Sequence, residues 1–155
     1  MKKTHVIIHH SLTKDGSVVS WNAIRKYHMT PGTISQEGAR DIGYHFGVEL
    51  VGEAYEVLMG RRPDEDGAHC REANMNRFGL GVCFIGNFDE EVPSLGLWQR
   101  GLWLVKGLIL GHDTPVENVM GHGEAQKSAA FPTPKTCPGK LFNMERFRAD
   151  LRASF

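Results

Sequence analysis

The sequence predicts an α/β fold: a single domain over residues 1–155, in which helices flank a central mixed β-sheet. The chain has 155 residues, of which 41% are hydrophobic and 23% are charged, as in ordinary globular domains. Short apolar runs with β-branched residues alternate with segments whose apolar residues recur at helical spacing. This alternation indicates strands and helices that share one core.

The first third of the chain predicts three strands and one helix. Residues 6–8 are a β-branched run typical of a buried strand. Ser20 is placed to cap a helix that ends before Pro31. Residues 44–51 and 54–59 are expected to be the two strands of a hairpin.

The middle of the chain predicts a surface connection, a strand and the longest helix. Residues 60–77 are rich in Gly, Pro, Asn and charge, so we expect a long surface connection. Residues 80–85 form a strongly apolar strand. Ser94 opens a helix with a wide apolar face, and Gly111 ends it.

The last third predicts a strand, a loop and a helix. Residues 119–120 read as a short strand. Residues 123–141 hold three prolines and are expected to be a loop. The final helix begins near Asn143 and has apolar residues on one face.

Composition excludes several classes of protein. Lys plus Arg and Asp plus Glu are 18 each, so no nucleic-acid partner is expected. No apolar run approaches the ~20 residues of a membrane span, so we expect no membrane anchor. The first residues lack the apolar stretch of a signal peptide, which indicates synthesis in the cytoplasm without export. The odd set of Cys70, Cys83 and Cys137 favours reduced thiols.

Candidate metal ligands follow the short strands. His9 and His10 follow directly on the first strand, and because side chains alternate, only one of them faces a given side. His122 follows another strand, and Cys137 comes two residues after Lys135 on a segment stiffened by prolines. Two imidazoles and a thiolate make a three-ligand zinc set that leaves a fourth position for water. The absence of Cys-x-x-Cys and His-Glu-x-x-His disfavours a zinc finger and a helix-borne protease site.

Six short motifs occur in a specific order over residues 4–148. They are VIIHHS (6–11), DIGYHF (41–46), GAH (67–69), LGVCFIGNF (80–88), GHGE (121–124) and KTCPG (135–139). In this order they resemble the zinc-dependent N-acetylmuramoyl-L-alanine amidases, a family that includes short phage lytic amidases and animal peptidoglycan recognition proteins. The resemblance implies the amidase fold, with one mixed sheet and flanking helices.

The resemblance also implies roles for individual residues. One zinc ion per chain would be held by His9, His122 and Cys137, and His10 would point away, either into packing or to support the ligands from behind. Tyr44 matches the tyrosine beside the metal water in the active members, and Lys135 matches a lysine two residues before the ligand cysteine. We expect Tyr44 to orient or deprotonate water and Lys135 to stabilise an oxyanion.

The expected groove is less typical of the family. His69 matches a histidine that lines the substrate groove. The fifteen positions from His122 to Cys137 exceed the spacing in short phage enzymes, and residues 71–78 lack the usual Gly-Tyr-Asn. Both departures bear on stem-peptide specificity and leave the metal set intact.

Other side chains receive simpler interpretations. Cys83, Trp98 and Trp103 are expected in the core, and His45 is expected to support the sheet. Cys70 reads as a surface or half-buried thiol. Glu124, two residues after a ligand, either orients a ligand or water or is a solvated loop carboxylate.

The function implied by the resemblance is hydrolysis of the amide between N-acetylmuramic acid and L-alanine in peptidoglycan. A small monomeric phage or prophage endolysin, acting on the wall after release from the cytoplasm, fits the single domain. Recycling of soluble wall fragments, non-catalytic peptidoglycan binding and a structural-zinc interaction protein are the alternatives.

Overall fold

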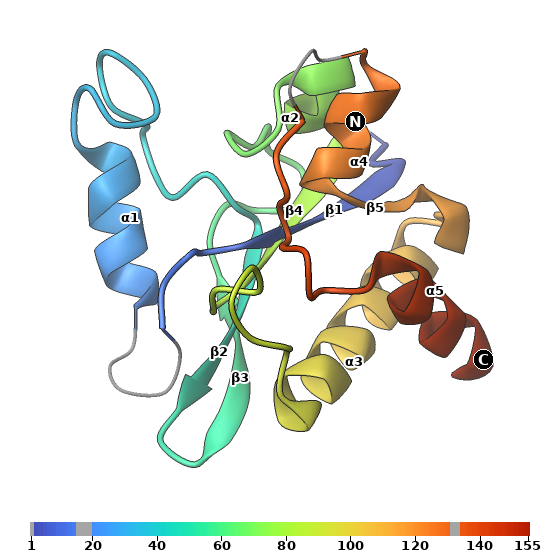
Figure 1. The fold of residues 1–155 in the computed structure, drawn as a ribbon. Coiled ribbons are helices and arrows are strands. Elements are labelled where there is room, and N and C mark those ends of the chain that lie inside the picture. Colours follow the sequence, from blue (N-terminus) through green and yellow to red (C-terminus); the bar gives the residue numbers. More distant parts are fainter. Residues whose placement is uncertain (1, 15–19, 131–133) are drawn as a thin grey trace.

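A computed structural model describes residues 2–14, 20–130 and 134–155 of the chain. Its core is one five-stranded sheet with the order β3-β2-β4-β1-β5, flanked by helices (Figure 1). The strands are β1 (His5–His10), β2 (Phe46–Val51), β3 (Ala54–Met59), β4 (Gly79–Phe84) and β5 (Val119–Gly121). The helices are α1 (Trp21–Met29), α2 (Met75–Phe78), α3 (Leu95–Gly111), α4 (His122–Ser128) and α5 (Met144–Ala153). Two 3-10 turns are η1 (Glu72–Asn74) and η2 (Val116–Asn118). The predicted α/β class is confirmed.

The sheet is mixed, and β1 lies in its interior. β1 pairs in parallel with both β4 and β5, β2 pairs in parallel with β4, and β3 runs antiparallel to β2. Ile8 is in register with Gly121 of β5. His9 follows Ile8 and His122 follows Gly121. The two histidines therefore lie side by side at the carboxyl ends of these parallel strands.

The two faces of the sheet have different coverings. Val6 and Ile8 point into the main core, which α3 and α5 cover. Ile7 points to the opposite face, where it packs with Cys70, Met75 and Ala125 beneath α2 and α4. Helix α1 packs on the same face, apart from α2 and α4, as Figure 1 shows. The carboxyl end of β1 therefore lies between α1 and the pair α2 and α4.

Two of the predicted helices are capped in different ways, one by a local side chain and one by a residue of the sheet. Ser94 Oγ accepts the Leu97 N–H at 3.2 Å, as the sequence predicted for α3. Helix α1 begins differently, because the buried carboxylate of Glu49 on β2 accepts the N–H groups of Ser20 and Trp21. A residue of the sheet thus fixes the start of α1.

The prediction of a loop from residue 123 was wrong for its first part, since residues 122–128 form α4. Glu124 Oε2 accepts the Gly121 N–H at 2.8 Å and so caps the helix. The same carboxylate pairs with Arg148 of α5 through two contacts of 2.9 and 3.0 Å. Glu124 therefore anchors a helix, and neither interpretation offered for it holds.

Three further expectations need correction. Residues 60–77 do not lie wholly on the surface, because Arg61, Cys70 and Met75 within them are buried. Cys70 is buried at 2% exposure, and Trp103 is 65% exposed rather than in the core. Cys83 is fully buried as expected. Within the described residues, every helix is too short or too polar to span a membrane.

Candidate metal centre

The structure brings His9, His122 and Cys137 together. Their potential ligand atoms all lie within 4.8 Å of one another. His9 Nδ1 and Cys137 Sγ are 3.7 Å apart. Tetrahedral zinc with typical Zn–N and Zn–S bonds places such atoms about 3.6 Å apart. The separation fits this metal without rearrangement of the two side chains.

Backbone contacts hold the three ligands in this arrangement. His9 is the next-to-last residue of an interior strand, and His122 is the first residue of α4. The Gly123 N–H donates to the Cys137 carbonyl at 2.7 Å and so ties the two later ligands together. A Cβ at Gly123 would lie 2.2 Å from the Lys135 carbonyl oxygen, so only glycine permits this approach.

Burial keeps the imidazole ligands neutral. Desolvation lowers the pKa of His9 well below 6.5, and the neighbouring His69 and His122 lower it further. Burial also lowers the pKa of His122, while the Glu72 carboxylate opposes this shift. Burial raises the pKa of Cys137 to about 12. Neutral imidazoles are the metal-binding form, and the thiol would lose its proton to a bound cation.

His9 is held from behind by His69. His9 Nε2 and His69 Nδ1 are 3.0 Å apart, which leaves His9 Nδ1 for Cys137 and a metal. The ring of His69 fits because a Cβ at Gly81 would lie only 2.6 Å from its Cδ2 atom. His69 Nε2 is buried and has no hydrogen-bond partner among the described residues. Although His69 borders the cavity, its ring nitrogens point toward the protein.

His122 is held by residues that the sequence did not single out. Its Nε2 lies 3.3 Å from Glu72 Oε2. Gln126 of α4 donates from Nε2 to Glu72 Oε1 at 3.2 Å, and Gln126 Oε1 accepts the Lys135 N–H at 2.7 Å. No sequence spacing connects position 72 with 122, and Glu72 falls in the segment that departs from the family pattern.

Tyr44 lies beside the metal ligands. Its ring centroid is 5.1 Å from that of His9. Burial raises the Tyr44 pKa well above 10, and the nearby Cys83 and Cys137 add to this shift. The hydroxyl therefore stays protonated at neutral pH and acts as a donor.

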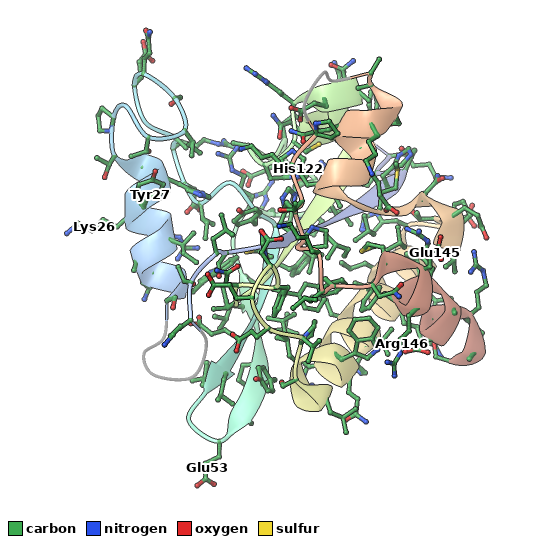
Figure 2. The ribbon with its side chains drawn as sticks, viewed as in Figure 1. Lys26, Tyr27, Glu53, His122, Glu145 and Arg146 are labelled. Carbon is green, nitrogen blue, oxygen red and sulfur yellow. The ribbon has the colours of Figure 1, made fainter. Side chains whose placement is uncertain are left out.

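One cavity of about 600 Å³ collects every residue proposed from the sequence. Its lining includes His9, Tyr44, His69, His122, Lys135 and Cys137. Lys135 is exposed at the rim, and Tyr27 of α1 also contributes to the lining. Figure 2 shows Tyr27 and His122 on helices that flank this region from opposite sides. The cavity is thus open for a substrate between α1 and α4.

Two neighbouring histidines serve the fold. His10 points to the opposite face, where its Nδ1 accepts the Phe88 N–H at 3.2 Å. His45 Nδ1 accepts the Gly81 N–H at 2.9 Å, and its Nε2 lies 3.1 Å from the Glu65 carbonyl oxygen. These contacts agree with the packing role expected of His10 and the sheet-supporting role expected of His45.

The chain matches a known protein family. The profile of the N-acetylmuramoyl-L-alanine amidase family, Amidase_2, matches residues 1–140. The chain belongs to this family. Among curated relatives of this amidase-family chain, peptidoglycan-recognition protein SD of Drosophila simulans is 40% identical over 104 residues. That match covers 59% of this chain and 52% of the relative. The matches cover between 27% and 67% of the lengths of the curated relatives.

Solved structures share the fold of this family member. The N-acetylmuramoyl-L-alanine amidase LysC from Clostridium intestinale superposes with a TM-score of 0.75 and 22% identity. The superposition covers 98% of this chain and 87% of LysC. A variant of Drosophila PGRP-LB in complex with tracheal cytotoxin gives a TM-score of 0.73 and 22% identity, covering 94% and 80% of the two chains.

Proposed function

We propose that this family member is a zinc-dependent amidase that hydrolyses the bond between N-acetylmuramic acid and L-alanine in peptidoglycan. The observation that carries the proposal is the grouping of two imidazoles and a thiol at the base of an open cavity. Three protein ligands and an open fourth position are typical of catalytic rather than structural zinc. One cavity holds all the proposed site residues, so a monomer suffices.

A zinc ion held by His9, His122 and Cys137 would act as a Lewis acid on the scissile carbonyl and make water a stronger nucleophile at neutral pH. Hydrolysis adds a hydroxyl group to the carbonyl carbon and a proton to the departing nitrogen as the C–N bond breaks. The protein must therefore stabilise an oxyanion and orient the attacking water.

Tyr44 and Lys135 are placed for these tasks. The protonated Tyr44 hydroxyl can donate a hydrogen bond near His9 and orient water or the substrate carbonyl. Lys135 lies at the cavity rim, and its positive charge reaches Cys137 and His122, whose pKa values it lowers. Such a cation stabilises the charge of a tetrahedral oxyanion more than that of the ground-state amide.

Non-catalytic peptidoglycan binding is the second candidate, because the curated relatives include peptidoglycan-recognition proteins. Binding alone requires neither a thiol at Cys137 nor a neighbouring Tyr44. A structural-zinc interaction protein would need no open cavity. The thiol of Cys137, the nearby Tyr44 and the open cavity support the proposal of an enzyme.

Incubation of purified protein with peptidoglycan tests the proposal. We expect release of stem peptides with new L-alanine amino groups, one zinc ion per chain, and loss of activity in chelator that added zinc restores. Binding to peptidoglycan without peptide release would favour the recognition domain. Zinc without binding or release would favour the structural role.

We also propose that the enzyme is lytic and acts on the cell wall after release from the cytoplasm where it is made. Rates on intact sacculi and on soluble anhydro-muropeptides separate this role from recycling. A lytic enzyme should prefer sacculi, and a clear preference for soluble fragments would assign it to recycling.

A further inference from the structure

The carboxylate of Glu72 is unusual for its burial. Its side chain is only 10% exposed, and the side chain of His122 beside it is 14% exposed. Among the described residues, no Lys or Arg nitrogen comes within 4.0 Å of this carboxylate, and its only charged partner at that range is His122. A buried anion is costly unless it is paired and hydrogen-bonded, so its partners indicate its purpose.

The contacts of Glu72 fix which nitrogen of His122 carries a proton. An ionised carboxylate only accepts hydrogen bonds. Because Glu72 Oε2 lies 3.3 Å from His122 Nε2, that nitrogen must carry hydrogen, and the lone pair of the neutral ring is on Nδ1. His122 is then presented to a metal through Nδ1, as His9 is.

Gln126 fixes the carboxylate in turn. A backbone N–H only donates, so the Lys135 N–H at 2.7 Å identifies the facing atom as Gln126 Oε1. The Gln126 amide must then donate from Nε2 to Glu72 Oε1 at 3.2 Å. Gln126 is 2% exposed, so water does not compete for these bonds. The carboxylate has one orientation, with its second oxygen aimed at His122.

The charges also agree with a cation at the site. A thiolate at Cys137 and the carboxylate of Glu72 together carry two negative charges, which a divalent ion would balance. Cys70 Sγ lies 3.5 Å from Glu72 Oε2, and burial raises the pKa of this thiol to about 12, so it remains a neutral donor.

We propose that Glu72 is a positioning residue for His122: through the contact with Nε2 it selects the Nε2–H tautomer and aims Nδ1 at the metal. The inference rests on the zinc role proposed above. Carboxylates that hold ligand histidines in this way raise metal affinity or activity by about 10–100-fold.

Zinc affinity of Glu72→Gln, measured by competition with a chromophoric chelator, tests the inference. The amide cannot accept from both His122 and Gln126, so one contact is lost. We expect zinc binding about 10–100-fold weaker than in the wild type. Glu124→Gln is the matched control, because Glu124 caps the same helix without touching the imidazole. It should lower the unfolding temperature and leave zinc affinity within a few-fold of the wild type.

Imidazole ¹⁵N shifts in metal-free protein give a readout that does not depend on zinc or activity. Wild-type His122 should populate the Nε2–H tautomer, and Glu72→Gln should mix the two tautomers. A wild-type Nδ1–H tautomer, or unchanged zinc affinity in Glu72→Gln, would overturn the inference and leave the amidase proposal standing. Failure of the wild type to bind zinc would instead overturn the proposed function, even if the tautomer is as expected.

Discussion

The two sides of the metal centre consist of different kinds of side chains, one neutral and aromatic and the other charged. The sheet side comprises His9, His69 and Tyr44, whose rings pack against one another. Burial holds these groups neutral, since it lowers the pKa of both histidines and raises that of the tyrosine. An interior strand fixes His9, so its position depends little on its hydrogen-bond partner.

The helix-and-loop side carries the charge. It comprises His122, Cys137, Glu72, Gln126 and Lys135. Its ligands begin a seven-residue helix and occupy a turn, and neither lies within the sheet. Hydrogen bonds through a buried carboxylate and amide replace the strand ladder that fixes His9. His9 is positioned by the strand that contains it. His122 lies outside the sheet, and the charged carboxylate of Glu72 positions it instead.

Loss of Cys137 should have the largest effect, because this residue joins the two sides. A serine hydroxyl is a poor zinc ligand at neutral pH, so Cys137→Ser should lose its zinc on gel filtration and fall to the activity of chelator-treated enzyme. Elemental analysis beside the peptide-release assay measures both. Retained zinc with full activity would remove Cys137 from the ligand set.

Tyr44→Phe tests the neutral side. The variant loses one hydroxyl and keeps the ring, so zinc content and unfolding temperature should stay near the wild type. We expect turnover to fall by about 10²–10⁴-fold, the usual contribution of a positioned proton-transfer group. Wild-type turnover on peptidoglycan would assign Tyr44 to packing against His9.

Lys135→Ala tests the charged side. Removal of an oxyanion-stabilising group should lower kcat by about 10²–10³-fold, with a smaller change in KM and no loss of zinc. Lys140→Ala is a control, because Lys140 is an exposed lysine on the same segment that does not line the cavity. If Lys135→Ala lost its metal or kept full kcat, Lys135 would be a structural cation.

His69→Phe asks whether the sheet side needs its hydrogen bond. The substitution keeps a ring and removes the acceptor for His9 Nε2, so we expect zinc affinity to fall by about 10-fold, the lower end of such effects. This loss should be smaller than that of Glu72→Gln. Unchanged zinc affinity with a raised KM would instead make His69 the groove residue that the sequence predicted.

Acid titration of metal-free protein tests the stability of the fold beneath the sheet side, and neither zinc affinity nor turnover enters this measurement. Burial lowers the pKa of His45 to about 4, so the unfolded state binds the extra proton first as pH falls below about 6.5. The stability from neutral His45 is complete above pH 6.5 and lost by about pH 4, a change of roughly 3 kcal/mol. Denaturant unfolding of His45→Gln should show a correspondingly shallower dependence on pH over this range. An unchanged slope would show that His45 titrates normally.

The sequence predicted the parts of the site that follow from strand ends and motif order. Parallel strands bring His9 and His122 to one edge, and the cavity contains Tyr44, His69 and Lys135 as expected. It did not predict Glu72 or Gln126, because their roles depend on how η1 packs against α4, which no local periodicity encodes.

The errors in the fold have related causes. Helix α4 was missed because glycine and nearby prolines indicated a loop, whereas the Glu124 cap and its pairing with Arg148 of α5 stabilise a helix. Ser20 occupies the N-cap position of α1 as predicted, but the carboxylate of Glu49, a residue of β2, accepts the hydrogen bonds there. In both cases a tertiary contact outweighed the local pattern.

The interior position of β1 has a consequence for biosynthesis. β2 and β3 can pair as soon as Met59 has been made, because they form a local hairpin. β1 must wait for partners in β4 and β5, and the ligand set is incomplete until Cys137 is added. At about 5–20 residues per second, several seconds of translation separate these events. β1 therefore stays unpaired at least until β4 has been made, and metal capture can only follow the synthesis of Cys137.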